Sequence, residues 1–314
     1  MLATMLLATA LGLAPLAVRL RPHDVPGMSS EQRLSELRAR SSHNPHAQLA
    51  HVKPLGLVPG FPMFVHDPTE CRYISRSLLR FGSWEPHLLS EIVATLASRP
   101  GERFLDIGAN IGSYTLAVVA AGFRAVAVEP MQYNVELLMA SVAATDGLWR
   151  NLTLFKSAVS ATAVAEPMCV VSHDRSGRGN KGNGQLALLS ECAAGANQAA
   201  GAAPAYEVVP VSTVDSLLAS RPQHQECFAA AKVDVEGFEV EALLGAARVF
   251  GGRCPPCLVV IEYVPYNNVS AVVSDKQRSI NPLPLLKSHG YSCGKRDASR
   301  HYRCRHPRCI PRAA

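Results

Sequence analysis

Short apolar runs alternate with helical patterns through the middle of the chain. The runs hold few polar side chains, as strands covered on both faces do, and they span residues 103–107, 125–128, 152–159, 231–235 and 258–263. Apolar positions at helical spacing follow or precede them at residues 84–98, 111–121, 132–144 and 238–249. Residues 206–211 predict one more strand, before a short helix capped by Ser212 or Thr213. Strands joined by helices predict an α/β domain with a mostly parallel sheet.

The ends of the chain have a different pattern. Residues 1–18 carry no charged side chain, and basic residues follow at once, so residues 1–20 are predicted to be a signal, membrane anchor or other targeting segment. Residues 21–60 are rich in Pro, Ser, His and Arg without a sustained apolar period, which predicts a stem or linker. The folded domain is therefore expected over residues 61–305, with a basic tail at 306–314.

One stretch inside the predicted domain lacks a regular pattern. Residues 173–203 are rich in Gly, Ala, Asn and Ser, which is typical of an irregular lid or insertion beside a site.

Composition indicates a folded protein with a basic end. Hydrophobic residues make up 48% and charged residues 18%, and the net charge is +6. Between Lys287 and Arg312 there are eight Lys or Arg residues and one acid, Asp297. Such a segment can contact phosphate or an anionic membrane, or simply be solvated. Aromatic residues are not interleaved with the charges, so no nucleic-acid partner is expected.

The cysteines and the N-terminal residues indicate in which cell compartment the protein works. Nine cysteines cannot all pair within one chain. One or two disulfides, a zinc site or free thiols are all open for the clustered residues, which are Cys254, Cys257, Cys293, Cys304 and Cys309. Asn151 and Asn268 head glycosylation triplets. The secretory pathway, in the ER or Golgi membrane or lumen, is the expected location. A chloroplast or mitochondrion is the alternative, because residues 19–43 are rich in Arg and Ser.

A glycine-rich turn joins the first strand of the alternation to its helix. From Asp106 to Gly112 the sequence reads DIGANIG. Gly108 permits a sharp turn with positive φ, and Gly112 lets the helix approach the sheet and a ligand closely. In this strand–turn–helix context the glycines predict a site for a nucleoside-bearing cofactor.

Three side chains near the turn bear on which cofactor binds. Asp106 can hold the ammonium of S-adenosylmethionine and would repel a pyrophosphate. Asn110 stands where a dinucleotide-binding loop has its middle glycine. Glu129 ends the second strand, where a carboxylate can accept both ribose hydroxyls of either cofactor. The set favours S-adenosylmethionine, and an NAD-dependent Rossmann oxidoreductase is the alternative.

Five segments together resemble one family in order and spacing. They read FLDIGANIGSYTL, VAVEP, SAVS, VPVSTVDSL and AKVDVEGFEVEALLGA and lie within about residues 100–265. They resemble the FkbM family of methyltransferases, in which asparagine is usual at the position of Asn110. The resemblance implies a Rossmann-like class I methyltransferase fold, with a seven-stranded, mostly parallel sheet and helices on both faces. Its antiparallel strand would come from residues 283–304. The resemblance also implies S-adenosylmethionine as the cofactor and O-methylation of hydroxyls, typically on sugars or polyketide-like compounds.

Two carboxylates are the candidates for the reaction centre. Asp234 and Glu236 follow the fourth strand, and ligands bind at the carboxyl ends of such strands. Either can act as a general base or orient the acceptor hydroxyl. The alternative is structural, with Glu236 capping the next helix and Asp234 pairing with Lys232.

Weaker candidates surround these two carboxylates. They are Glu262 facing the acceptor, Ser157 near an adenine edge, and His173 as a base. No metal site is predicted from His, Asp and Glu spacing.

The function expected from the sequence is O-methylation of a hydroxyl on a glycan or small metabolite. Membrane association through residues 1–18 is possible on this reading. A non-catalytic binding module that keeps the fold is a second alternative to the enzyme.

Overall fold

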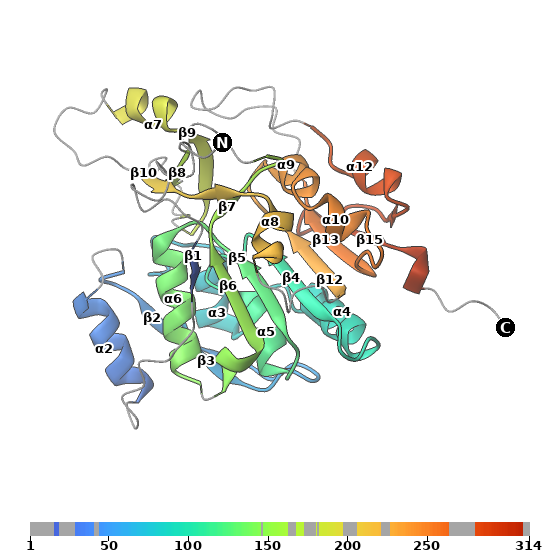
Figure 1. Cartoon of the computed structure of the whole chain (residues 1–314). Coiled ribbons are helices and arrows are strands. Elements are labelled where there is room, and N and C mark those ends of the chain that lie inside the picture. The colour runs from blue at the N-terminus through green and yellow to red at the C-terminus, as the bar shows by residue number, and fades with distance from the viewer. Residues whose placement is uncertain are drawn as a thin grey trace.

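A sheet forms where the sequence has its apolar runs. The computed structural model of the protein describes residues 16–18, 29–40, 44–145, 147–162, 168–172, 180, 182–196, 206–220, 227–263 and 280–309. These residues form an eight-stranded sheet in the order β1-β6-β5-β4-β12-β13-β15-β14 (Figure 1). Its parallel strands are β4 (Arg103–Ile107), β5 (Ala125–Val128), β6 (Leu152–Lys156), β12 (Phe228–Val233) and β13 (Leu258–Glu262).

The two edges of the sheet hold its antiparallel pairs. β15 (His301–Arg305) runs antiparallel to β13, and β14 (Ser292–Cys293) pairs with β15. These strands confirm the predicted seven-stranded, mostly parallel sheet, and its antiparallel strand comes from the expected region. The eighth strand, β1 (Leu16–Val18), lies inside the segment predicted to be a targeting sequence, and it pairs with β6. That prediction otherwise concerns residues outside the described part of the chain.

Helices cover both faces of the sheet and bury its apolar side chains. One core lies under α4 (Pro86–Ala97), α5 (Ser113–Ala120) and α6 (Gln132–Ala143). The other lies under α8 (Val214–Ala219), α9 (Glu239–Leu244), α10 (Ala247–Phe250) and α12 (Leu283–Ser288). Every residue of β4 and β12 is buried, and each large aliphatic side chain so placed contributes about 1.5–3 kcal/mol.

A second layer of short elements lies at the carboxyl end of the parallel strands. β8 (Met168–Ser172), β9 (Gly184–Leu188) and β10 (Tyr206–Val209) form a small sheet with α7 (Leu189–Ala196) beside it. It lies beyond the carboxyl ends of the parallel strands (Figure 1) and packs on residues from the loops that follow them. β7 (Ala158–Val159) and β11 (Val211–Ser212) form a two-stranded connection, and η1 (Leu148–Asn151) precedes β6.

The predicted stem is partly folded. α2 (Ser30–Arg40) and the hairpin β2 (Gln48–Val52) and β3 (Phe61–Val65) precede α3 (Ile74–Phe81), and residues 47, 50, 52 and 58 belong to the core. The hairpin is fastened to α6, where the Phe64 N–H donates to the Ser141 hydroxyl at 2.8 Å. The folded domain therefore begins well before residue 61.

Four other predicted boundaries differ from the structure. Residues 184–196, expected to be irregular, form β9 and α7. The helix expected at 238–249 is two short helices, since Ala246 between them has a non-helical φ and ψ. The strand expected at 152–159 is broken at Ser157 into β6 and β7, and the one at 231–235 begins at Phe228 and ends at Val233.

Disulfides join four pairs of cysteines. They are Cys169–Cys192, Cys227–Cys254, Cys257–Cys309 and Cys293–Cys304, and Cys71 is a buried free thiol. The disulfide option for the clustered cysteines thus holds, but with three bridges rather than the predicted one or two, and their sulfurs are not available to zinc. The first residues of the predicted basic tail form η4 (Pro307–Cys309). They are held by the disulfide of Cys309 and by the ion pair of Arg308 with Glu102 at 3.0 Å.

Candidate active site

Polar side chains gather where the central strands end. Asp106 in β4 pairs in register with Lys232 in β12, and Glu262 at the end of β13 pairs with His301 of β15. Residues paired in register project from the same face of a sheet, and so do residues two apart along a strand. Asp234, two residues beyond Lys232, therefore joins the same row. The face is the one that α4 and α5 cover.

The glycine turn is pressed against the loop that follows β12. Gly108 has φ +85°, and a Cβ there would stand more than 1 Å inside ordinary contact distance from the Asp234 carbonyl oxygen. Gly112 has φ +86°, and a Cβ there would lie 2.9 Å from the Leu138 side chain in α6. Glycine at 108 thus brings the predicted cofactor turn and the predicted catalytic loop into direct contact, while glycine at 112 serves helix packing.

Glu129 is held under the turn by three donors. Its Oε2 accepts the Asn110 N–H at 2.9 Å, and its Oε1 accepts the Met131 N–H and the Asn134 amide, both at 3.0 Å. A carboxylate offers about four lone-pair positions, so these contacts leave about one for a ligand. Burial raises the pKa of Glu129 to about 7 against the effect of these hydrogen bonds. The predicted contact of Glu129 with both ribose hydroxyls stays a prediction.

Asp106 keeps an unpaired oxygen beside this turn. Its Oδ2 accepts the Thr115 hydroxyl at 2.6 Å, and its buried Oδ1 has no hydrogen-bond partner in the described part of the chain. Burial raises the pKa of Asp106, and the Lys232 ammonium opposes that rise. An orphaned buried carboxylate oxygen is costly unless a donor reaches it. The site therefore fits a ligand that brings an ammonium or another donor.

Ser157 is turned away from this group. The side chain is fully buried, and its hydroxyl donates to the carbonyls of Ala158 and Pro210 at 2.8 and 3.2 Å. These bonds attach the break between β6 and β7 to Pro210, which lies between β10 and β11. The predicted contact with an adenine edge stays a prediction.

The pairing expected between Lys232 and Asp234 is present. The Lys232 ammonium, with 5% of its side chain exposed, lies 2.7 Å from Asp234 Oδ2. Burial works to raise the pKa of Asp234, but Lys232 and His301 outweigh it and lower the value to about 2. Asp234 is therefore an anion at any working pH, and a weak base.

Glu236 has a different role from the predicted helix cap. It has φ +54°, and its Oε1 accepts a hydrogen bond from the Asn183 amide. The loop N–H groups of Val235 and Gly237 instead donate to Glu239, at 3.3 and 3.1 Å. Burial, together with the charges of Asp234 and Glu239, raises the pKa of Glu236 to about 8.

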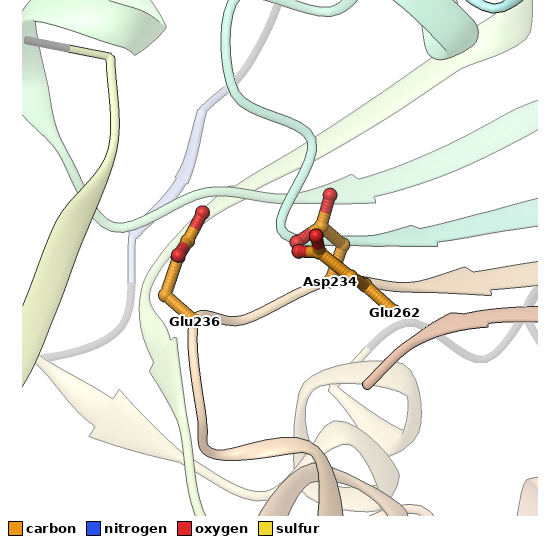
Figure 2. A group of neighbouring side chains, drawn as sticks. All are labelled: Asp234, Glu236 and Glu262. Carbon is orange, nitrogen blue, oxygen red and sulfur yellow. The ribbon is translucent and has the colours of Figure 1, made fainter. Parts of the chain in front are cut away.

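Glu262 completes a group of three carboxylates. Figure 2 shows the Glu262 carboxyl group beside that of Asp234. Glu236 projects from the loop that follows Asp234. Oxygen atoms of the three residues lie within 4.8 Å of one another, a spacing that could also hold a metal ion. Burial and the charges of Asp234 and Glu236 raise the pKa of Glu262 to about 10, so it carries a proton at neutral pH. Glu262 was a weaker candidate from the sequence, expected to face the acceptor. Its closeness to Asp234 and Glu236 was not predicted, because it lies one strand and one crossover away from them.

Further buried groups extend the network beyond the predicted residues. Glu85 caps α4 with φ +41°, and its carboxylate accepts the Tyr114 hydroxyl at 2.7 Å and lies 3.5 Å from His301 Nδ1. The Lys232 ammonium stands 5.4 Å from the centre of the Tyr114 ring. No sequence motif marks these residues, since they come from three separate elements. His173, a candidate from sequence, lies outside the described residues.

The protein resembles known methyltransferases in both sequence and fold. The family model of the methyltransferase FkbM domain matches residues 106–292, more than half of the chain. The solved structure of methyltransferase FkbM from Methylobacillus flagellatus KT is 17% identical, over 71% of this chain and 50% of that one, with a TM-score of 0.40. A precorrin-6y C5,15-methyltransferase from Geobacter metallireducens GS-15 is 13% identical, over 70% of this chain and 87% of that one, with a TM-score of 0.33.

The matches differ in how much of each protein they cover. The chain spans half the length of the Methylobacillus protein, and no curated protein matches it. Among the described residues, no helix has the length and apolar character needed to cross a bilayer. The family match nevertheless begins at Asp106 and includes both the glycine turn and the three carboxylates. Because this match covers more than half of the chain, the protein belongs to the family defined by the methyltransferase FkbM domain.

Proposed function

We propose that the protein transfers the methyl group of S-adenosylmethionine to a hydroxyl of a glycan or small metabolite. One observation carries this proposal. The contact of Gly108 with the Asp234 carbonyl joins the two halves of a transfer site. Asp106 closely precedes the turn and Glu129 accepts a hydrogen bond from it, whereas Glu236 belongs to the loop that Gly108 contacts.

The residues of the turn fit S-adenosylmethionine. The free Oδ1 of Asp106 can accept a hydrogen bond from the ammonium of the amino-acid tail, and the remaining position on Glu129 can accept one from a ribose hydroxyl. An acid at the position of Asp106 disfavours a pyrophosphate, which supports this cofactor over NAD. When bound, S-adenosylmethionine supplies an electrophilic methyl group on a positively charged sulfur.

The protein's own task is to hold the acceptor hydroxyl and to receive its proton. Among the three carboxylates, Glu236 is best suited to that task. Asp234 is a weak base with pKa about 2, and Glu262 already holds a proton. Glu236, with pKa about 8, is partly ionised near neutral pH and binds a proton firmly once it is ionised. General bases so placed accelerate reactions by about 10²–10⁴-fold, and alignment of the two reactants contributes about 7–11 kcal/mol.

We also propose that the protein works in an oxidising compartment, with the secretory pathway as the first choice. The four disulfides support this, because disulfides persist outside the reducing cytosol. Location in an organelle is the alternative, and it can be distinguished by following the tagged full-length chain in cells. A single cleaved N-terminus in secreted material would support a signal peptide in residues 1–20.

Two measurements test the proposed function. Calorimetry should detect binding of S-adenosylhomocysteine but not of NAD, and Asp106→Asn should weaken that binding by about 10- to 100-fold, because a charge-assisted hydrogen bond is lost. Labelled S-adenosylmethionine, incubated with a panel of glycans and metabolites, should then mark the acceptor. With that acceptor Glu236→Gln should lose at least about 100-fold in kcat, while the control Glu241→Gln, on the next helix, should not. Binding of NAD instead, or full activity of Glu236→Gln, would contradict the proposal.

A further inference from the structure

A short segment crosses the boundary between the two halves of the site. Gly182 and Asn183, just before β9, lie over the glycine turn. The Gly182 carbonyl accepts the amide of Asn110 at 2.8 Å and that of Asn134 at 2.9 Å. A Cβ at Gly182 would stand 3.1 Å from Asn110 Oδ1, so the approach is close. The segment is thus attached to the cofactor side of the site.

Asn183 attaches the same segment to the acceptor side. Its Nδ2 donates to Glu236 Oε1, and its Oδ1 lies 3.4 Å from the Nδ2 donor of Asn110. The amide side chain supplies the acceptor and the donor from two separate atoms. Asn110 is itself fixed, since its Oδ1 accepts the Ile111 N–H at 2.8 Å.

The contacts form one continuous chain of hydrogen bonds. It runs from Glu236 through Asn183 to the side chain of Asn110, whose backbone N–H donates to Glu129 at 2.9 Å. The carboxylate proposed to receive the proton is thereby connected to the carboxylate proposed to hold the ribose. Glu236 needs such a partner, because it sits in a left-handed conformation beside two other acids.

We infer that Asn183 is a positioning residue, which makes the orientation of Glu236 depend on whether the cofactor side is occupied. This inference rests on the proposed function and adds a coupling between its two halves. A ligand bound to Glu129 and Asn110 stabilises the position of Asn110, and the hydrogen bonds of Asn183 then stabilise one orientation of Glu236. Such coupling is reciprocal, so a ligand bound at Glu236 should in turn strengthen binding at Glu129. The acceptor base is then set in place only when a methyl donor is present.

Hydrogen exchange of the full-length chain with S-adenosylhomocysteine tests the coupling. In the parent protein the ligand should slow exchange by at least about threefold both in the turn around residues 106–112 and in the loop around Glu236. In Asn183→Ala the protection of the turn should remain and that of the loop should disappear. The control Asn180→Ala changes an amide three residues away, whose bridge to Cys71 is made by the backbone, and it should behave as the parent.

The outcomes separate this inference from the proposed function. No protection of the turn in the parent would refute the cofactor site itself. Protection of the turn together with equal protection of the Glu236 loop in parent and Asn183→Ala would refute the role of Asn183 alone. If Asn183→Ala does not fold, Asn183→Asp, of the same shape but without the donor, gives the same comparison. Asn183→Gln, which keeps donor and acceptor, should restore part of the loop protection.

Discussion

Gly108→Ala should damage both folding and turnover, because the added Cβ has no room. The residue has φ +85°, which costs a non-glycine residue about 1–2 kcal/mol. The new Cβ would also stand more than 1 Å inside contact distance from a backbone carbonyl, which cannot rotate away as a side chain can. Overpacking of this kind costs about 1–3 kcal/mol, so a total loss of about 2–5 kcal/mol is expected.

Gly122→Ala is the matched control. Gly122 has φ +88°, almost the same as Gly108, but a Cβ there meets nothing within 4 Å. Gly122→Ala should therefore lose only the stability that the positive φ costs an alanine. The difference in unfolding free energy between the two variants then isolates the contact of the turn with the Asp234 loop. Urea unfolding should show Gly108→Ala to be less stable by at least about 1 kcal/mol.

Methyl transfer should separate the two variants more widely. A displacement of about 1 Å in a reacting pair can reduce the rate by about 100-fold, so Gly108→Ala should lose that much in kcat while Gly122→Ala retains its activity. Equal stability and equal turnover in the two variants would refute the close approach of the two loops.

Three other outcomes are expected. The kcat/KM of the parent should rise with pH through about 8, as Glu236 loses its proton, and a profile that stays flat in the parent would exclude this residue as the base. Glu262 has a folded pKa of about 10, above its unfolded value, so its stabilising effect is complete below the unfolded pKa and is lost as pH rises towards 10. Unfolding measured from pH 6 to 9 should accordingly show falling stability in the parent and a smaller fall in Glu262→Gln; equal slopes would contradict the raised pKa. Alkylation of the denatured, unreduced chain followed by mass spectrometry should label one cysteine, Cys71, and a labelled Cys257 or Cys309 would contradict their disulfide.

The sequence predicted the central strands well because their pattern is decided locally. β4 and β5 match the predicted bounds at both ends, since each is an apolar run bounded by a turn and buried on both faces. The α2 helix and the β2 strand were missed because their polar composition hides the few apolar positions that contact the core. In the same way β9 and α7 were hidden by small residues, whose local preference is weak and whose main contacts are with β8.

The candidate site was predictable in part. The cofactor turn, Glu129 and the pair of Lys232 with Asp234 follow from motif and strand alternation, since a few consecutive residues determine them. Glu262 was a candidate because it ends a strand, but its closeness to Asp234 was not predicted. That closeness and the contacts of Asn183 depend on pairings between distant elements, which no spacing in a single sequence reveals. The disulfide partners depend on the same long-range arrangement.

Three of the disulfides lie at the end of the sheet away from the chemistry. Cys227 and Cys257 immediately precede β12 and β13, and Cys304 pairs in register with Val259, near the start of β13. Three of the four disulfides thus close the chain at the amino ends of the strands, and the fourth, Cys169–Cys192, is confined to the small sheet and α7 beyond their carboxyl ends. Under the proposed function, the acceptor side can consequently accumulate substitutions, and so accept a new substrate, while the opposite end of the sheet keeps its covalent anchorage.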